Sequence, residues 1–403
     1  MVLRIAMLLD NPFRPDLRVL KEAEALTAAG HQITIIAWDR DKGINLPSQE
    51  TLNGIRINRI TSKTGKQLGL RQIPHFLAYG WRAFQFAFKQ KYDVVHCHDF
   101  LTLILGVLVK WFRRVSLVYD AHEIYWIMEA RKYHPVFLNL LKYWEIFLIR
   151  WVDVFITVGN KRSDYYHPYT KKAISIVGNW YDPQPMDENL REKTRNRLDI
   201  PLEAFVVTYA GTLSPVRASG TLIESIEQLR DDSQIHWIIC GQGPSDSLFM
   251  HTASRIPSVH YLGWLKDLAP YFAASDALVY LMDPSHPYCN YNAPNSLYLS
   301  IAWGLPLIGI DAGEIGSIIT TEESGLLVQE VEPESVSNAI RMLVENKDLH
   351  KRIVVNLRSM QKTYSWESAA EALVTAYEKI LPGVEEQGST MINDSGLYFR
   401  IKR

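Results

Sequence analysis

The sequence has few cysteines and no surplus of either charge. Its 403 residues contain three cysteines, Cys97, Cys240 and Cys289, which lie far apart. A secreted disulfide framework needs paired cysteines and a zinc knuckle needs closely spaced ones, so both are excluded and a reducing cytosol is expected. The 43 lysines and arginines nearly balance the 44 aspartates and glutamates. No overall field attracts nucleic acid, and we expect no nucleic-acid partner.

Long hydrophobic runs and internal repeats are lacking too. The longest apolar stretch, residues 100–109, has about half of the roughly 20 residues that span a bilayer. Residues 1–13 lack the length and cleavage site of a signal peptide and predict a strand. No period of 20 to 50 residues recurs, which excludes solenoids and propellers. We therefore expect a cytoplasmic protein that is either soluble or peripheral at the inner membrane face.

What the sequence does have is a regular alternation. Short runs rich in Val and Ile alternate with helix-length amphipathic segments, as is typical of a parallel sheet covered by helices on both faces. The predicted strands are 3–9, 32–38, 55–60, 93–98, 115–122, 154–159 and 174–179, followed by 205–211, 235–241, 259–263, 277–282, 305–310 and 325–328. The fold class is therefore α/β, with two Rossmann-like, doubly wound domains facing a central cleft.

The domain limits follow from composition. Residues 182–201 are polar, charged and framed by prolines, as is typical of a connection between domains. We predict domains over 1–180 and 181–364. A helix follows over 365–382, because apolar residues recur on one face from Ser365. The tail 383–403 is polar and is expected to be flexible.

The loop after the first strand carries two arginines. Arg14 and Arg18 lie in the polar segment 10–18, where charge-assisted donors suit a phosphate or an anionic acceptor. The alternative is a solvated arginine that pairs with Asp16. Because the turn lacks the G-x-G-x-x-G pattern of dinucleotide loops, we interpret it as an acceptor loop.

Two histidine and carboxylate segments end neighbouring strands. HCHD supplies His98 and Asp99, and DAHE supplies His122 and Glu123, at the edge that faces the predicted cleft. A histidine beside a carboxylate can shuttle a proton or donate a hydrogen bond to a hydroxyl. Their spacing resembles no common set of zinc ligands, so we predict no metal site.

The second half carries two strand-to-helix turns. Gly211, Thr212 and Arg217 lie in the first, where a guanidinium beside a helix N-terminus suits a diphosphate. Gly241 and Gly243 lie in the second, where glycines allow close backbone approach. The alternative for both is an ordinary turn.

The segment 283–309 is the most informative. A polar loop leads into Pro294, which opens an apolar helix that stops at Gly304. The backbone N–H groups around Asn295, Ser296 and Leu297 then lie at the binding edge, aimed at an anion. The alternative is a buried helix after a disordered loop.

In their order and spacing these segments resemble the retaining glycosyltransferases of family 4, which have the GT-B fold. The resemblance covers nearly the whole chain and rests on GHQITIIA, DVVHCHD, YDAHE, VDVFITVGNKRSDYY, VTYAGTLSPVRASGTLIESI, IICGQGP, YLGWL, SIAWGLPLIG, EIGSIITTEESGLLV, PESVSNAIRML and SWESAAEAL. It implies that domain 1–180 binds the acceptor and domain 181–364 the nucleotide sugar. It also implies that helix 365–382 crosses back to the first domain.

The resemblance also implies roles for single residues. His122 and Arg217 would be catalytic, with the leaving diphosphate against Arg217 and the helix start. The nucleotide sugar would contact Gly211, Thr212, Arg217, Gly241, Gly243, Leu262, Asn295, Ser296 and Leu297. The acceptor would contact Arg14, Arg18, His98, Asp99 and Glu123. No metal ion or other cofactor is needed in the family, because positive charge and helix ends offset the charge of the leaving diphosphate.

Three positions depart from the family pattern. Thr212 stands where a phosphate-binding arginine is usual, and Tyr291 and Leu299 stand where the family has paired glutamates. Leu299 cannot accept hydrogen bonds from ribose hydroxyls, a contact worth roughly 0.5 to 3 kcal/mol.

Two functions therefore stay open. One is transfer of a hexose or N-acetylhexosamine from a nucleotide diphosphate sugar to a glycan or lipid-linked acceptor in cell-surface polysaccharide synthesis. The other is a catalytically degenerate nucleotide- or sugar-binding subunit that supports an active partner glycosyltransferase. A sugar-nucleotide epimerase would need more acidic residues than the predicted cleft offers.

Segments 76–92 and 136–152 are rich in aromatics with interspersed Lys and Arg. They predict either an interfacial face that reaches a lipid-linked acceptor or an aromatic cover for the sheet.

Overall fold

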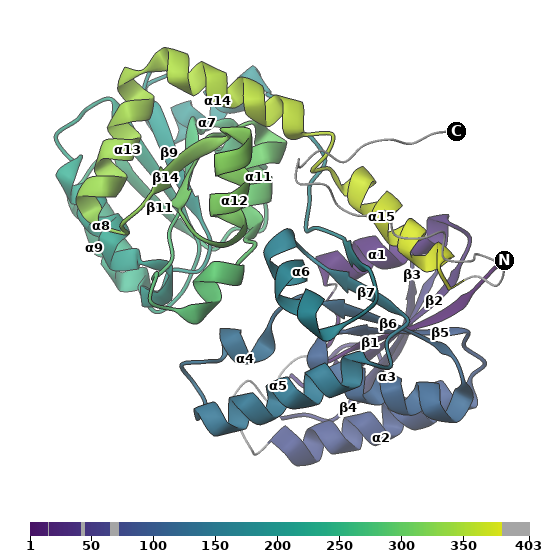
Figure 1. Cartoon of the computed structure of the whole chain (residues 1–403). Coiled ribbons are helices and arrows are strands. Elements are labelled where there is room, and N and C mark those ends of the chain that lie inside the picture. The colour runs from purple at the N-terminus through teal and green to yellow at the C-terminus, as the bar shows by residue number, and fades with distance from the viewer. Residues whose placement is uncertain (15, 42–44, 65–71, 381–403) are drawn as a thin grey trace.

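The computed structural model describes residues 1–14, 16–41, 45–64 and 72–380, which form two sheets flanked by helices (Figure 1). The first sheet has eight strands in the order β3-β4-β2-β1-β5-β6-β7-β8. Their bounds are β1 Arg4–Leu9, β2 Gln32–Asp39, β3 Gln49–Leu52, β4 Ile55–Thr61, β5 Val94–His98, β6 Ser116–Ala121, β7 Val154–Thr157 and β8 Ile174–Ile176.

The second sheet has six strands in the order β11-β10-β9-β12-β13-β14. Their bounds are β9 Phe205–Ala210, β10 Ile235–Cys240, β11 Val259–Gly263, β12 Ala277–Tyr280, β13 Leu307–Ile310 and β14 Gly325–Val328. In both sheets the strand order reverses beside the first strand, at β1 and at β9. Ligands of open α/β sheets bind at the carboxyl ends of the strands near such a point.

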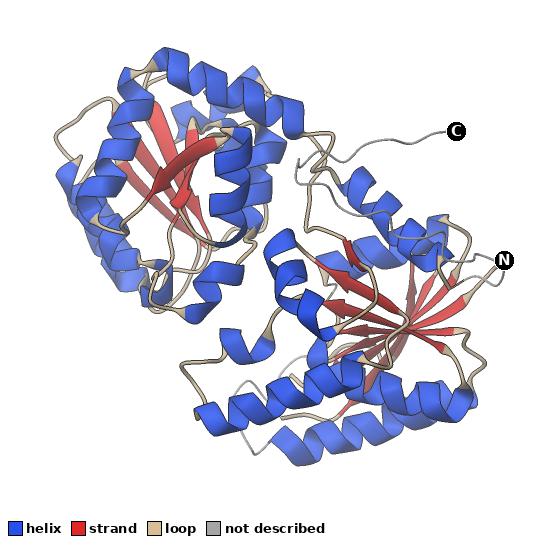
Figure 2. Ribbon diagram, viewed as in Figure 1, coloured by secondary structure: helices blue, strands red, loops and turns tan. Residues whose placement is uncertain are grey.

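Helices cover both faces of each sheet (Figure 2). Their bounds are α1 Leu17–Ala28, α2 Ile73–Lys89, α3 Asp99–Arg113, α4 Tyr125–Met128, α5 Pro135–Ile149, α6 Asn160–Tyr166, α7 Glu188–Arg197, α8 Ser219–Gln228, α9 Asp246–Arg255, α10 Ala269–Ala273, α11 Asn295–Trp303, α12 Gly313–Glu322, α13 Pro333–Glu345, α14 Lys347–Met360 and α15 Trp366–Glu378. Short 3₁₀ turns are η2 His167–Tyr169, η3 Pro215–Arg217 and η4 Pro287–Tyr291. The architecture confirms the predicted pair of doubly wound α/β units.

The two faces of the first sheet have separate cores. Residues of α2, α3 and α5 pack on one face, and residues of α1 and α15 pack on the other. Helix α15 contacts α1, β7 and β8, with Leu373 and Tyr377 buried. The C-terminal helix therefore lies on the first sheet, although it follows the second sheet in sequence. Residues 381 and 382 of the predicted helix and the tail 383–403 lie outside the described residues.

The polar segment 182–201 is more structured than its composition suggests. Helix α7 occupies its second half, and Arg195 on α7 is fully buried. Its guanidinium pairs with Asp276 at 2.7 Å and donates to the carbonyls of Ala204 and Ala274. The segment still joins the two sheets, and its second half forms a helix that sequence reasoning did not predict, because buried polar partners stabilise a segment with few apolar residues.

Strand β3 was not among the predicted strands. It pairs antiparallel with β4 at the sheet edge, and its sequence, QETL, is polar. Edge strands do not need the apolar alternation on which sequence prediction depends.

The carboxyl edges of the two sheets are in contact. Arg131, from the loop after α4, pairs with Asp283 beyond β12 at 2.8 Å. Glu314 in the first turn of α12 accepts hydrogen bonds from the backbone N–H groups of Asn160 and Lys161, each at 3.0 Å. A carboxylate at a helix N-terminus is stabilised there, so α12 caps α6 of the other unit. Among the described residues, no helix combines the length and apolar character needed to cross a membrane.

Candidate active site

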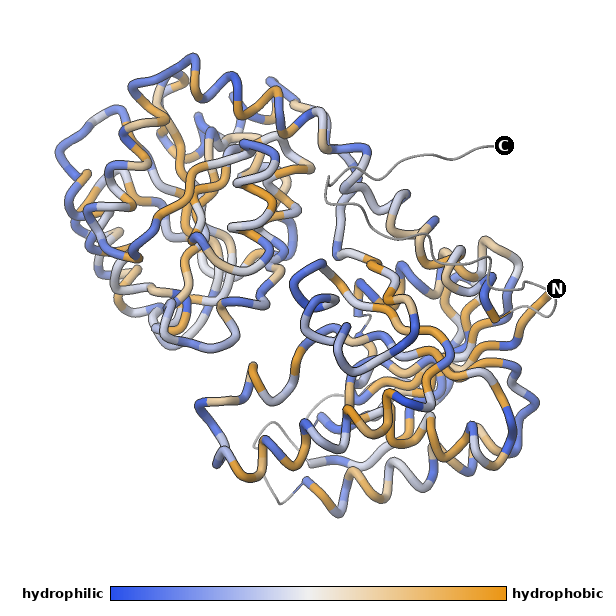
Figure 3. The backbone as a smooth tube through the Cα atoms, viewed as in Figure 1, coloured by the Kyte–Doolittle hydropathy of each residue, from blue (hydrophilic) through white to orange (hydrophobic). Residues whose placement is uncertain are grey.

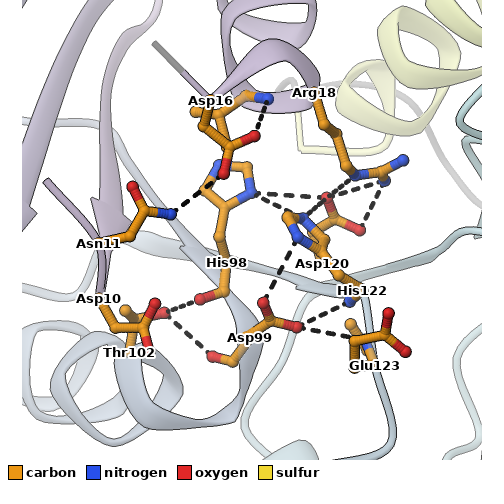
Figure 4. Close-up of polar contacts among 12 residues, drawn as sticks. Asp10, Asn11, Asp16, Arg18, His98, Asp99, Thr102, Asp120, His122 and Glu123 are labelled. Carbon is orange, nitrogen blue, oxygen red and sulfur yellow. Dashed lines mark hydrogen bonds and ion pairs between the residues drawn. The ribbon is translucent and has the colours of Figure 1, made fainter. Parts of the chain in front are cut away.

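A cluster of charged side chains lies at the carboxyl ends of β5 and β6 (Figure 4). His98 is the last residue of β5, and His122 follows the last residue of β6. The strand register pairs His98 with Asp120, so the two segments predicted from sequence meet side by side. Arg18 reaches the same place from the first turn of α1.

Arg18 forms the centre of this cluster. Its Nη2 lies 2.9 Å from both carboxylate oxygens of Asp120 and 3.0 Å from Glu22 Oε1. Its Nη1 donates to the Val177 carbonyl at 2.7 Å and to Asn179 at 2.9 Å. Arg18 is 9% exposed. The prediction that Arg18 binds the acceptor is wrong, because its donors are occupied and the side chain is buried.

His122 lies between two carboxylates. Its Nε2 is 2.8 Å from Asp120 Oδ2, and its Nδ1 is 3.4 Å from Asp99 Oδ2. Burial alone would lower the pKa of His122, but the charges of Asp99 and Asp120 outweigh burial and raise the pKa to about 10. The ring therefore carries a positive charge at neutral pH. This charge favours hydrogen-bond donation by His122 over the predicted alternative of a proton shuttle.

Asp99 positions the loop that carries His122. It adopts a left-handed backbone with φ of 64°, which is unusual outside glycine but tolerated by Asp. Its Oδ1 accepts from the backbone N–H groups of His122 at 3.0 Å and Glu123 at 3.3 Å. Desolvation raises the pKa of Asp99 to about 6, although 36% of its side chain stays exposed. Asp99 thus holds the loop of His122 with one carboxylate oxygen while part of its side chain stays exposed, and its acceptor contact stays a prediction.

Behind His122 lies a buried row of histidines. His98 Nδ1 is 3.1 Å from His122 Nε2, and the rings of His96 and His98 stack with centroids 4.3 Å apart. The hydroxyl of Tyr377 on α15 lies 2.8 Å from His96 Nδ1. Burial lowers the pKa of both His96 and His98, so both rings are neutral. His98 is 3% exposed, and its predicted acceptor contact is wrong because His122 and the protein enclose it.

Ligand atoms of Glu22, His96, His98 and Asp120 all lie within 4.8 Å of one another. Such a set could coordinate a metal ion on geometry alone. However, the Arg18 guanidinium lies against both carboxylates, and its charge opposes a divalent cation at the same place. The described residues therefore fit a charge cluster centred on arginine better than a metal site.

In this cluster, the titration of Glu22 should change the free energy of unfolding by a measurable amount. Burial raises the pKa of Glu22 to about 8. The folded protein then holds a proton that the unfolded chain releases, so Glu22 lowers stability as pH rises from about 4.5 to 8. We expect Glu22→Gln to gain on the order of 2 kcal/mol of unfolding free energy relative to wild type between pH 4.5 and 8. Urea denaturation at pH 4.5, 6 and 8 measures this change.

Glu24→Gln, on the same helix, controls for the loss of a carboxylate from α1. If Glu22→Gln and wild type differ by a constant amount across this pH range, Glu22 does not hold a proton in the folded state.

Glu123 and Arg14 are also engaged within the protein. Glu123 pairs with Arg162 at 2.8 Å and accepts a short hydrogen bond from Tyr288, which belongs to η4. Arg14 pairs with Asp41 and not with Asp16, which caps α1 instead. The carboxylate of Glu123 joins the two units, and 36% of its side chain is exposed, so its acceptor contact stays a prediction. Arg14 lies apart from the histidine cluster.

Arg217 is the main cation on the opposite edge. It ends η3, its guanidinium lies 4.9 Å from the centre of the Tyr280 ring, and its Nη1 is 3.8 Å from the Met282 sulfur. Burial raises the pKa of Tyr288, and the charges of Arg162 and Arg217 oppose that rise, which places both arginines near Tyr288. Within the described parts of the chain Arg217 makes no ion pair. Its charge is therefore available to an anion.

Helix α11 starts at Asn295. Shortly before it, the Asn292 amide contacts Tyr280 and Met282, which are also the neighbours of this arginine. The Ser296 hydroxyl lies 3.5 Å from the carbonyl of Ala210 at the end of β9, and no side chain caps the helix. Asn295 is exposed and Ser296 half-buried, as an anion site at a helix start requires. Leu297 does not fit its predicted role, because its side chain is buried in the core and its N–H donates to Pro294.

The glycines of the second unit have a packing role. A Cβ on Gly241 would lie 1.8 Å from the Gly211 carbonyl oxygen, and one on Gly243 would lie 2.2 Å from that of Leu213. The turn after β10 therefore packs directly on the loop after β9. This packing brings Gly241, Gly243, Gly211 and the exposed Thr212 together. Leu262 is half-buried on β11, next to that turn.

Two of the three positions that depart from the family pattern, Leu299 and Tyr291, face the protein. Leu299 packs against the core of the second unit, and the ring of Tyr291 lies edge-on to Tyr165, with centroids 5.2 Å apart. Sequence reasoning missed Arg162, Tyr288 and Glu314, which join the two edges. Their only local signal is a charged or phenolic residue beside a strand or helix end.

Two families match the sequence. Residues 18–185 match the family described as Glycosyltransferase Family 4, and residues 204–346 match the family described as Glycosyl transferases group 1. The chain is 24% identical to the D-inositol 3-phosphate glycosyltransferase of Corynebacterium glutamicum over 83% of this chain and 84% of that protein. Together the two family matches span most of the chain.

Solved structures share the fold. Sucrose-phosphate synthase from Thermosynechococcus elongatus superposes with a TM-score of 0.75 at 17% identity, over 94% of this chain and 99% of that one. HepE from Anabaena in complex with UDP-glucose superposes with a TM-score of 0.68 at 16% identity, over 93% of this chain and 99% of that one.

Proposed function

The chain belongs to glycosyltransferase family 4 and has the GT-B fold, and from this premise we propose that it transfers a hexose or N-acetylhexosamine from a nucleotide diphosphate sugar to a lipid-linked glycan acceptor in cell-surface polysaccharide synthesis. The observation that carries the proposal is the pair of cations at the facing edges. His122 lies on one edge, and Arg217 lies on the other beside the uncapped start of α11.

These groups suit the departure of a diphosphate. Arg217 and the first N–H groups of α11 would bind the two phosphates, whose charge grows as the bond to the sugar breaks. The acceptor hydroxyl would attack the same face of the sugar and pass its proton to the leaving phosphate oxygen. Fixed positive charge performs this task without a metal ion, so we propose a metal-independent enzyme. HepE holds UDP-glucose, which makes UDP-glucose the first sugar donor to test.

The outer face of α2, α3 and α5 supports a lipid-linked acceptor. The large exposed hydrophobic residues on these helices and their flanks are Ile73, Leu77, Trp81, Phe88, Trp111, Phe112, Val136, Phe137, Leu140, Tyr143, Trp144, Phe147 and Trp151. Apolar stretches run along α2 and α5 (Figure 3). Helix α3 contacts both. Patches of this kind mark protein or membrane contact.

The charged residues on this face indicate which kind of membrane it would contact. The acidic residues of these three helices are Asp99, at the active edge, and the fully buried Glu145, whereas Arg82, Lys89, Arg113 and Lys142 carry positive charge. Aromatics with Lys and Arg are typical of an interfacial helix on anionic lipid. We therefore propose that this face, here called the aromatic face, rests on an anionic bilayer.

Leu140→Glu is expected to weaken binding to vesicles of phosphatidylglycerol and phosphatidylcholine at least about tenfold, because it removes apolar area and adds a repelled charge. Sedimentation with the vesicles measures it. Leu248→Glu is a matched control, since Leu140 and Leu248 are both 53% exposed and Leu248 lies on α9. Equal binding by both variants would contradict the assignment of the aromatic face.

Transfer itself is tested with purified protein and a panel of nucleotide sugars, with release of the nucleoside diphosphate as the readout. Turnover of at least one sugar donor is expected, and His122→Ala should abolish most of it. If no sugar donor is turned over when lipid-linked acceptors are present, the result would contradict the proposed transfer.

Leu299 and Thr212 favour a second candidate, a nucleotide- or sugar-binding subunit of an active partner enzyme. Calorimetry separates the two. Nucleotide-sugar binding without turnover, unaffected by Leu299→Glu, would support the subunit.

A further inference from the structure

A tyrosine hydroxyl joins the two units next to the charged cluster. Tyr288 belongs to η4 of the second unit and is 6% exposed. Its hydroxyl accepts a short hydrogen bond from Arg162 Nη2 and donates another to Glu123 Oε2. Arg162 Nη2 also lies 2.8 Å from that carboxylate oxygen. Arg162 and Glu123 both belong to the first unit, so one hydroxyl of the second unit is bound between an ion pair of the first.

The groups in this contact are costly to bury. Arg162 is 2% exposed, and its Nε has no hydrogen-bond partner among the residues that the structure describes. Burial raises the pKa of Tyr288, so its hydroxyl keeps its proton and can donate to Glu123. Buried ionic contacts contribute little net stability once desolvation is counted, and in some proteins they select one arrangement among several. A contact of this kind suits the placement of one unit against the other.

On the side of the first unit, the contact ends at the loop of His122. Glu123 is the next residue, and Asp99 accepts hydrogen bonds from the backbone N–H groups of both. The loop is thus held through its backbone by Asp99 and through the Glu123 side chain by Tyr288 and Arg162. Movement of the Glu123 carboxylate would therefore pull on the segment that positions the His122 ring.

On the side of the second unit, the same short segment leads to Arg217. The η4 turn ends at Tyr291, and the amide of the following Asn292 contacts Tyr280 and Met282. These two side chains are the neighbours of the Arg217 guanidinium. Helix α11 then begins at residue 295. Tyr288 therefore lies on the stretch of chain that connects the contact between the units to the proposed diphosphate site.

This stretch is also packed tightly from behind. A Cβ on Gly313, where φ is 60°, would lie 2.7 Å from the Cys289 carbonyl oxygen and 2.9 Å from that of Asn292. The Asn292 carbonyl accepts a hydrogen bond from the backbone N–H of Glu314 at 3.1 Å. The Glu314 carboxylate in turn caps α6, the helix that carries Arg162. The η4 turn is therefore held between the start of α12 and the ion pair of the first unit.

We propose that Tyr288 is a positioning residue for sugar transfer: together with Arg162 it holds Glu123, and so the loop of His122, at a fixed place relative to Arg217. It acts through Glu123 and Asn292 and not by a contact with the substrate. That transfer is the affected reaction rests on the proposed function, whereas the coupling of the two units does not.

Tyr288→Phe removes the hydroxyl alone and is the first test. We expect kcat for sugar transfer to fall about 10- to 100-fold, because small misplacements of reacting groups have effects of this size. The affinity for UDP-glucose, measured by calorimetry, should stay within about twofold, since Arg217 and the start of α11 are unchanged. Arg162→Lys keeps the charge but loses the planar fork, and it should lower kcat in the same way. The double variant should lose less than the product of the two single effects, because both act through one contact.

Tyr166→Phe is the matched control. Tyr166 is also a buried tyrosine that donates to a glutamate, but its partner Glu145 lies in the same unit. Its kcat should stay at the wild-type value. An equal fall of kcat in Tyr166→Phe, or an unchanged kcat in Tyr288→Phe, would overturn the proposal. Lost affinity for UDP-glucose at constant kcat would also overturn it, since Tyr288 would then bind the sugar donor.

The placement of the units is measured without any reaction. Spin labels on Lys91→Cys in the first unit and Leu248→Cys in the second report the distance between them, since the three native cysteines are buried. Tyr288→Phe should broaden the distribution of this distance, and Tyr166→Phe should not. An unchanged distribution in Tyr288→Phe would contradict the coupling. If wild type turns over no sugar donor, the proposed function fails, and the distance measurement still decides whether Tyr288 sets the placement of the units.

Discussion

Arg217→Ala is expected to lower kcat/KM for sugar transfer by about 10²- to 10³-fold, the size of effect seen when a group that stabilises developing negative charge is removed. Its charge is fixed beside Tyr280 and is not neutralised by a carboxylate of the described chain. Thr212 stands where the family has a second cation, so on the proposed function Arg217 would carry this task with the start of α11.

The division of the effect between kcat and KM is informative. Charge on the diphosphate grows as the bond breaks, so kcat should fall more than the affinity for the nucleotide sugar. Steady-state kinetics and a separate binding titration measure the two. Arg217→Lys keeps the charge but not the planar fork, and should retain part of the activity.

Arg255→Ala is the control, since Arg255 is exposed on α9 and pairs with Glu227. A variant at Arg217 that loses only nucleotide affinity and keeps kcat would mean that Arg217 binds the ground state alone.

The positive charges of Arg217 and His122, on the two edges, have different causes. Arg217 is a guanidinium, which is charged at any physiological pH, and it has no ion pair within the described residues, whereas His122 owes its charge to Asp99 and Asp120. Tyr288 of the second unit donates to Glu123, the residue after His122, and the charge of Arg217 opposes the rise in the pKa of Tyr288. The distance between the two cations is therefore set by contacts between the two units. A shift of one unit against the other would change the charge around the diphosphate directly.

Much of the fold was predictable because its signals are local. Runs such as VFITVG and FVVTYAG mark strands that are buried on both faces, and Gly304 ends α11 with φ of 66°, as predicted. The meeting of the two histidine and carboxylate segments at one edge also followed, because carboxyl ends of parallel strands share one edge. Strand β3 and helix α7 escaped prediction because polar contacts, not apolar periodicity, hold them.

The partners of individual side chains were not predictable. Arg18 and Arg14 look alike in sequence, yet one is enclosed by Asp120 and Glu22 and the other pairs with Asp41 at the surface. Their partners lie 102 and 27 residues away, and only the packed sheet decides which arginine is buried. The same holds for His98, whose ring packs against those of His96 and His122.

Asp120→Asn is expected to destabilise the protein by about 3 to 5 kcal/mol, because it leaves buried cations without their shared partner. Asp120 is fully buried and lies within hydrogen-bond distance of Arg18 and His122. Urea denaturation measures the loss. Asp93→Asn is the control, since Asp93 forms a comparable pair with Arg4 at the surface, where a much smaller loss is expected.

The same variant should also change the charge of His122. Without Asp120 the ring keeps only Asp99 as an acidic partner, and the nearby Arg18 charge now opposes its protonation. The pKa of His122 should therefore fall, and transfer should decline toward the alkaline side of neutral pH as the ring loses its proton. NMR titration of the imidazole follows the first change, and a pH profile of kcat follows the second. If Asp120→Asn unfolds no more easily than Asp93→Asn and leaves both titrations unchanged, the carboxylate does not hold this edge of the molecule together.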